Sequence, residues 1–189
     1  MPSVERYSAA DREYLLNVAM LSIRSGLECG RQYAPEEVQT LMSLQHKRAC
    51  FVTLKLAGKL RGCVGNMEAT SRLVDAVAKN TYRAAFEDAR FEPVSEQEIV
   101  NLTIDISVLT PLKLLAVASN QALIDTLRPD IDGLLFEAGA HRATFLPSVW
   151  EQLPSAENFV SHLKKKAGLA SDYWSDDVNC WVYEAIKIE

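Results

Sequence analysis

The sequence predicts an α+β protein, with a mainly antiparallel sheet flanked by helices and a smaller α+β subdomain. Two hairpin patterns and several helical patterns follow one another without the regular strand–helix–strand rhythm of a parallel sheet. The 189 residues are enough for one domain with a main core and a smaller appended part. We therefore expect residues 1–189 to form a single domain, divided into a larger and a smaller subdomain.

A long amphipathic helix is expected near the N-terminus. Ser8 and Asp11 have the spacing of a capping box, in which each side chain bonds the backbone of the other residue. The pattern continues to Gly26 and Gly30, where glycine favours a helix end. Its apolar residues recur at helical spacing and are Tyr14, Leu15, Val18, Ala19, Leu21 and Ile23.

A β-hairpin and a second helix follow. Residues 49–56 are rich in β-formers, and Gly58-Lys59 separates them from residues 60–65 as a two-residue turn with Gly first. Ser71 is expected to cap the second helix. The buried face of that helix consists of Leu73, Val74, Val77, Ala78, Thr81, Ala84 and Ala85.

The remaining chain predicts four more elements. Residues 102–108 alternate as a strand, whose covered side is Leu102, Ile104, Ile106 and Val108. A short helix over 119–127 precedes a second hairpin, 134–137 with 143–146, around Gly139. Ser155 begins a helix that stops at Gly168. Residues 180–188 alternate as one terminal strand.

Composition excludes several classes of protein. The net charge of −5 disfavours nucleic-acid binding, which needs clustered Lys and Arg. The four cysteines form no CxxC pair, so neither a disulfide framework nor a zinc site is expected. The first five residues lack a secretion signal, and no segment reaches membrane-spanning length. A cytoplasmic protein that needs no membrane is expected.

The segment Leu60-Arg61-Gly62-Cys63-Val64-Gly65 concentrates unusual residues and is the expected functional focus. Two glycines weaken a strand and indicate a bulge, or a close approach by a ligand or another chain segment. Simple alternation places Arg61 and Cys63 on one face, where the cation would lower the pKa of a nucleophilic thiol. With a Gly58-Lys59 turn, however, Cys63 pairs with Leu54 on the apolar face. A one-residue slip would turn it outward.

Other residues carry weaker hypotheses. The connection from Gly65 to Ser71 ends at a helix N-terminus, where backbone amides, Asn66 and Arg61 could hold a small anion. An ordinary strand-to-helix connection explains the same residues. His141 lies at a hairpin tip, as either a general base or an ordinary turn residue. No metal is expected, because the histidines and cysteines lack ligand spacing, and no cofactor is expected.

The motif resembles the LRGCIG signature of the AMMECR domain family, with Val64 in place of the usual Ile. The likeness covers most of the chain from about residue 10 onward. It continues through residues 85–91, 106–111, 132–134, 144–150 and 159–168. It looks closest to the prokaryotic branch called AmmeMemoRadiSam system protein A. At the second hairpin, Ala143 stands where relatives often have Gly.

The resemblance implies an α+β fold with a larger and a smaller subdomain, and partnership with a Memo-like protein and a radical SAM enzyme. We therefore expect an accessory or binding protein that uses the surface around Leu60, Gly62 and Gly65, with Asn66 and Ser71, to hold a partner or a small anionic ligand. The enzymatic alternative makes Cys63 the nucleophile, Arg61 the activating cation and His141 the acid/base.

Overall fold

The computed structural model describes residues 7–35 and 42–189, which form two compact units. The first unit contains the described residues up to Leu109 together with Ile186–Glu189, and the second unit contains Thr110–Ala185. Both units combine helices with antiparallel strand pairs, so the predicted α+β class is confirmed. Among the described residues, no helix combines the length and apolarity that crossing a membrane requires.

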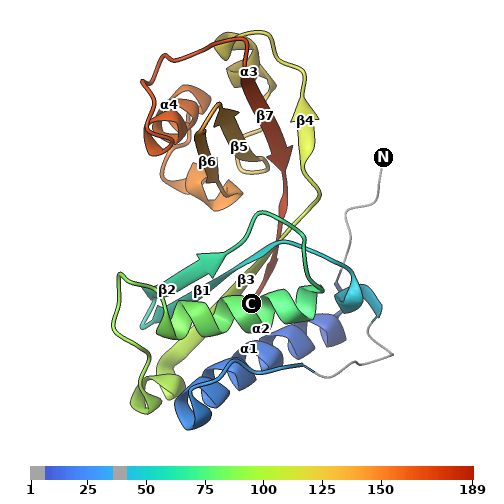
Figure 1. Ribbon diagram of the computed structural model, residues 1–189, viewed down its shortest axis with the longest axis vertical. Helices are drawn as coiled ribbons and strands as arrows, with labels where there is room; N and C mark the ends of the chain where they lie inside the picture. The colour runs from blue at the N-terminus through green and yellow to red at the C-terminus, as the bar shows by residue number, and fades with distance from the viewer. Residues whose placement is uncertain (1–6, 36–41) are drawn as a thin grey trace. The chain divides into compact units, whose positions relative to one another are not determined.

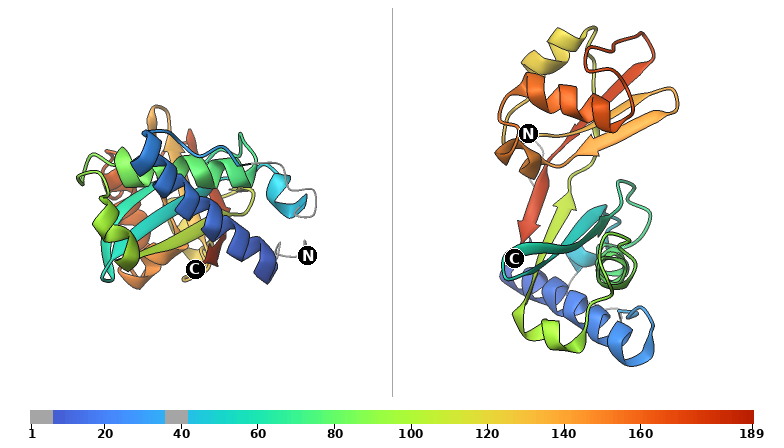
Figure 2. Two further views of the ribbon diagram at one scale, coloured as in Figure 1. Left: turned by 90° about the horizontal axis from the view of Figure 1, so that it is seen from below. Right: turned by 90° about the vertical axis from the view of Figure 1, so that its left-hand side faces the viewer.

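The first unit packs two helices on one face of a four-stranded sheet (Figure 1, Figure 2). The sheet order is β2-β1-β3-β8, so β2 is an edge strand. Short 3-10 helices lie at Met42–Gln45 and Glu96–Asn101. The main elements are α1 (Ala9–Cys29), β1 (Cys50–Leu56), β2 (Lys59–Gly65), α2 (Leu73–Phe86), β3 (Leu102–Leu109) and β8 (Ala185–Ile188).

Helix α1 begins and ends as the sequence predicts. Ser8 accepts a hydrogen bond from the backbone of Asp11, and Asp11 accepts one from the backbone of Ser8, which completes the capping box. Gly30 then takes the left-handed conformation at the C-cap, and its amide donates to the Gly26 carbonyl. The predicted start and end of this helix are confirmed.

The turn of the first hairpin lies one residue earlier than predicted. Ala57 and Gly58 have φ of 49° and 77°, which makes them the two central residues of the turn, and Leu56 pairs with Lys59. Positive φ at both positions matches a type I′ turn, whose twist fits that of the strands. The register shifts beside Leu54 and leaves Arg61 as an extra, bulged residue. The predicted Gly58-Lys59 turn is wrong because Ala57 adopts a conformation that alanine rarely takes.

Helix α2 buries the predicted face but starts without the predicted cap. Its N-cap is Arg72, and no side chain caps the helix there. The Leu73 amide donates to the His46 carbonyl at 2.9 Å. The Ser71 cap is therefore wrong, because an upstream carbonyl takes the place of the hydroxyl.

The second unit has its own four-stranded sheet and its own core. The sheet order is β4-β7-β5-β6. Trp150 and Phe159 stack in the core with ring centroids 3.9 Å apart. The short helix expected over 119–127 is present with Ser119 as its N-cap, and Ser155 begins the next helix as predicted. The elements are β4 (Lys113–Leu115), α3 (Asn120–Thr126), β5 (Gly133–Ala138), β6 (His141–Phe145), α4 (Ala156–Lys166) and β7 (Val178–Tyr183), with a 3-10 helix at Pro147–Glu151.

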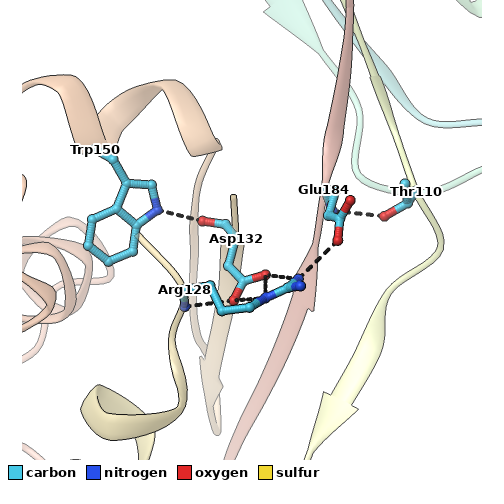
Figure 3. Close-up of polar contacts among 5 residues, drawn as sticks. All are labelled: Thr110, Arg128, Asp132, Trp150 and Glu184. Atoms are coloured by element: carbon cyan, nitrogen blue, oxygen red, sulfur yellow. Dashed lines mark hydrogen bonds and ion pairs between the residues drawn. The ribbon is translucent and has the colours of Figure 1, made fainter. Parts of the chain in front are cut away.

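The expected single terminal strand is two strands, β7 and β8, which belong to different sheets and are separated by Glu184. Figure 3 shows the polar contacts that Glu184 makes at this break. Its amide donates to Thr110 Oγ1 at 2.8 Å, and Arg128 donates to its carboxylate at 2.9 Å. Arg128 is itself held by Asp132, whose carbonyl accepts the Trp150 indole N–H. The alternating pattern runs unbroken through Glu184, so it could not reveal this division.

Candidate functional site

The LRGCVG motif lies on the edge strand β2, and its glycines are explained by close packing within the first unit. A Cβ atom on Gly62 would lie 2.1 Å from the Ala84 carbonyl oxygen of α2. A Cβ on Gly65 would lie 2.3 Å from the Phe51 ring. Both distances are far below van der Waals contact, so any larger residue would push α2 or Phe51 away. Of the explanations offered for these glycines, close approach by another segment of the chain accounts for both.

Cys63 lies on the face of the sheet opposite α1 and α2. It pairs with Thr53, while the neighbouring residues Val52 and Leu54 are fully buried on the helix-covered side. The predicted pairing with Leu54 is therefore wrong, because the turn and the bulge change the register. The Thr53 hydroxyl lies 3.4 Å from Cys63 Sγ, and the Cys63 residue is half-buried. The thiol thus belongs to a polar face of the sheet.

The same face carries other polar groups next to Cys63. Asp105 of β3 pairs across the sheet with Thr53, and its carboxylate binds Lys55 Nζ at 2.5 Å. Thr53 therefore stands between the thiol and this ion pair. No group of three or more His, Cys, Asp or Glu side chains is placed to hold a metal within residues 7–35 and 42–189.

Arg61 does not bind the thiol; it anchors the segment that follows α2. Its Nε donates to Glu98 Oε1 at 2.6 Å and its Nη2 to Glu98 Oε2 at 3.1 Å. The carbonyls of Glu92 and Pro93 accept two further bonds. The hydrogen bonds from Arg61 lower the pKa of Glu98 to about 2. The guanidinium that was expected to activate Cys63 is therefore committed to a structural ion pair.

Asp88 and Arg90 contact Cys63 instead. The Cys63 amide donates to Asp88 Oδ2 at 2.9 Å, and Arg90 Nη2 donates to the Cys63 carbonyl at 3.2 Å. Arg90 also pairs with Asp88 through two nitrogens, at 2.9 and 2.7 Å. These hydrogen bonds hold the pKa of Asp88 well below its usual range. Together the two residues occupy the outward backbone groups of an edge strand, which would otherwise be open to another strand.

Neither Asp88 nor Arg90 was among the site residues expected from the sequence. The available signal was the segment 85–91, which belongs to the family resemblance and directly follows a helix that packs on the motif. The pairing itself could not be read from the sequence, because 25 residues separate Asp88 from Cys63.

The four cysteines differ in their accessibility. Burial raises the pKa of Cys50 and of Cys180 to about 12, so these thiols stay protonated and unreactive. Cys29 is exposed at the end of α1, and Cys63 is half-buried. Cys63 is therefore the half-buried cysteine that lies within a sheet, where its backbone bonds the side chains of Asp88 and Arg90.

The remaining predicted site residues have separate roles. Leu60 is 46% exposed beside the hairpin turn. Asn66 accepts a hydrogen bond from the buried Asn80 at 2.8 Å, and its own amide donates to the Glu68 carbonyl. The Ser71 carbonyl accepts the Arg48 amide. The Asn66–Ser71 connection is thus held by bonds within the chain, and the first helical amide is already used by His46.

His141 belongs to the second unit, at the start of β6. Its Nδ1 forms a hydrogen bond with the Ala167 carbonyl at 2.8 Å, just after α4. This bond orients the ring within its own unit and links the hairpin to the helix end. This contact gives His141 a local structural role.

The fold and the site define a two-unit α+β protein with a half-buried cysteine on an edge strand, whose outward backbone groups are bonded by an Asp–Arg pair. The family model of AMMECR1 matches residues 16–188. The chain belongs to the AMMECR1 family.

Relatives share this architecture over most of their length. Protein MK0488 of Methanopyrus kandleri is 34% identical over 194 residues, covering 98% of this chain and 91% of that protein. A protein of Methanothermobacter thermautotrophicus is 33% identical, covering 86% of this chain and 84% of its own. The crystal structure of the uncharacterized protein PH0010 from Pyrococcus horikoshii matches with a TM-score of 0.84 and 31% identity, over 93% of this chain and 89% of that chain.

Proposed function

We propose that this protein is an accessory or binding protein, which docks a partner on the polar sheet face around Cys63. The partners are those of the AmmeMemoRadiSam branch that the chain resembles, a radical SAM enzyme and a Memo-like protein. The observation that carries the proposal is that the half-buried Cys63 thiol lies on the sheet face opposite the helices, on a strand whose backbone is held in place. Thr53 contacts the side chain, and Asp88 and Arg90 hold the backbone.

A fixed, partly polar surface suits binding, because a preorganised site loses little conformational entropy when a partner docks. The residues that shape it are held from behind: α2 packs against Gly62, and Arg61 is bound to Glu98. These contacts stabilise the strand without using the Cys63 thiol itself. The motif therefore combines a tightly packed inner face with an outer face that still carries accessible groups.

The second candidate function is a cysteine-dependent enzyme with Cys63 as nucleophile. One observation favours it: the Cys63 thiol is half-buried on an outer sheet face, and the Arg90 guanidinium binds the carbonyl of the same residue. In this form of the hypothesis Arg90 takes the role first assigned to Arg61.

Two substitutions at Cys63 separate docking from nucleophilic catalysis. Cys63→Ala removes the thiol and leaves the face open, whereas Cys63→Tyr adds bulk that would block a docked partner. Binding to the purified radical SAM enzyme and Memo-like protein should survive in Cys63→Ala and be lost in Cys63→Tyr. Cys29→Tyr, at an exposed cysteine outside the sheet, is the matched control for added bulk.

Retention of full binding by a folded Cys63→Tyr variant would contradict the docking proposal. The enzymatic candidate predicts a different pattern, in which Cys63→Ala abolishes turnover by the combined system while partner binding is unchanged. Circular dichroism and melting temperature would confirm that each variant is folded before binding is measured.

A further inference from the structure

Arg90 is an exposed arginine that the protein nevertheless holds in one place. Its side chain is 56% exposed, whereas that of its partner Asp88 is 7% exposed. Nε and Nη2 bind the Asp88 carboxylate, and Nη2 also binds the Cys63 carbonyl. The guanidinium also lies 5.5 Å from the centre of the Phe91 ring. Arg90 is therefore oriented from three sides although much of it faces solvent.

One nitrogen of this guanidinium, Nη1, remains open among the described residues. A guanidinium offers five N–H donors in a planar fork, and two of them are on Nη1. Within the part of the chain that the structure describes, the hydrogen bonds of the Arg90 side chain come from Nε and Nη2. By contrast, Arg61 uses Nε, Nη1 and Nη2, and its side chain is 13% exposed. Arg90 thus keeps donors that Arg61 has already used.

The carboxylate end of this pair is buried and keeps the Cys63 and Arg90 amides as donors, whereas the guanidinium end is screened by solvent and costs entropy to order. A fixed guanidinium whose Nη1 keeps its two N–H donors is suited to a single carboxylate oxygen, because a hydrogen bond between two charged groups is stronger than a neutral one. The hydrogen bonds to Asp88 already hold the Arg90 side chain in place, so a ligand would not have to order it. This arrangement favours recognition of an anionic group over a purely structural role.

We infer that Arg90 receives, through Nη1, a carboxylate side chain of the docking partner, which places the partner's chain over the Cys63 thiol. This inference rests on the proposed function, because it names the partner chemistry at the same site. It also moves the expected anion from the Asn66–Ser71 connection, where the Asn66 side chain and the Ser71 carbonyl are bonded within the chain, to the Arg90 end of β2.

Two alkylating reagents of similar size test the cation directly. Iodoacetate carries a carboxylate, whereas iodoacetamide is neutral, so the ratio of their rates at Cys63 reports the charge near the thiol. Arg90→Gln should lower this ratio about threefold, the factor for one unit charge about 6 Å away in water. Arg90→Lys keeps the charge and should keep the ratio. Cys29 in the same molecules provides the internal control.

Partner binding tests the docked carboxylate itself. Arg90→Gln should weaken binding of the radical SAM enzyme or the Memo-like protein at least tenfold, and Arg90→Lys, which lacks the planar fork, should restore it in part. An unchanged rate ratio, or no reaction of Cys63 with either reagent, would overturn the inference. So would unchanged partner binding in Arg90→Gln. If Cys63→Tyr still blocks docking in that case, the proposed function stands and only the role of Arg90 is lost.

Discussion

The two ends of strand β2 are both held by an arginine–carboxylate pair, yet the two arginines differ in exposure. At the hairpin end, Arg61 and Glu98 are 13% and 19% exposed, and the guanidinium also binds two carbonyls. At the Cys63 end, Arg90 is 56% exposed, and its hydrogen bonds to the described residues come from Nε and Nη2 and leave Nη1 open. Removing Arg61 would leave the Glu98 carboxylate without its cation and two carbonyls without this donor, whereas Asp88 would keep the Cys63 and Arg90 amides if the Arg90 side chain were removed. The comparison teaches that the guanidinium at one end of the motif is bonded within the fold at all three nitrogens, while the guanidinium at the other end keeps donors exposed to solvent.

The largest loss of stability is expected where the inner face of β2 meets α2. Gly62→Ala places a Cβ 2.1 Å from a backbone oxygen, so the helix must shift, and the free energy of unfolding should fall by about 3 kcal/mol. Gly58→Ala, with a φ of 77° but no atom near its Cβ, should cost only about 1 kcal/mol. Urea unfolding followed by circular dichroism measures both. Equal losses would remove close packing as the reason for Gly62.

The next effect is expected at the hairpin end of the strand. Arg61→Ala leaves the Glu98 carboxylate and two carbonyls without their donor, and should lower the free energy of unfolding by about 2 kcal/mol. Glu98→Gln should lose part of the same energy, and the double variant should lose less than the sum of the two. If the losses of the two single variants simply add in the double variant, Arg61 and Glu98 do not stabilise each other.

Acid should weaken the same pair in a defined range of pH. The folded-state pKa of Glu98 is about 2, below its ordinary value of 4.5, so the folded state favours the ionised carboxylate. The stabilisation is complete above pH 4.5 and is lost as the pH falls towards 2. Wild type should therefore lose stability more steeply than Glu98→Gln between these values. Parallel pH profiles of unfolding free energy would contradict this assignment.

The smallest change in stability is expected at the Cys63 end. Arg90→Gln removes a guanidinium that is 56% exposed, and the buried Asp88 keeps the Cys63 and Arg90 amides as donors, so the free energy of unfolding should fall by about 1 kcal/mol. Partner binding should nevertheless be reduced more than in any variant at the hairpin end that remains folded. A loss of stability as large as that of Arg61→Ala would erase the distinction between the two ends.

Much of the fold follows from local patterns, whereas the site depends on distant contacts. The capping box at Ser8, the serine caps at Ser119 and Ser155 and the buried face of α2 involve residues within one helical turn or one helix, so the sequence shows them. The hairpin register depends on Ala57 taking a positive φ, which nothing in its side chain signals. The change of turn alone would still have paired Cys63 with the buried Val52, and the bulge at Arg61 is what turns Cys63 to the other face.

The partners of the motif could not be read from local sequence for the same reason. Arg61 and Glu98 lie 37 residues apart, and Cys63 and Asp88 lie 25 residues apart. The expectation that Arg61 serves Cys63 relied on their adjacency along one strand, but a bulge at Arg61 breaks that alternation. Likewise, Glu184 divides the terminal strand through a bond to Thr110, 74 residues away.

The central claim is that Cys63 presents its thiol outward in the folded protein, and native-state labelling of the four cysteines tests it most directly. Iodoacetamide labelling located by mass spectrometry should modify Cys29 and Cys63 without unfolding. Cys50 and Cys180 should react only at the rate at which their units open. A Cys63 rate that equals the Cys50 rate at every urea concentration would contradict the claim.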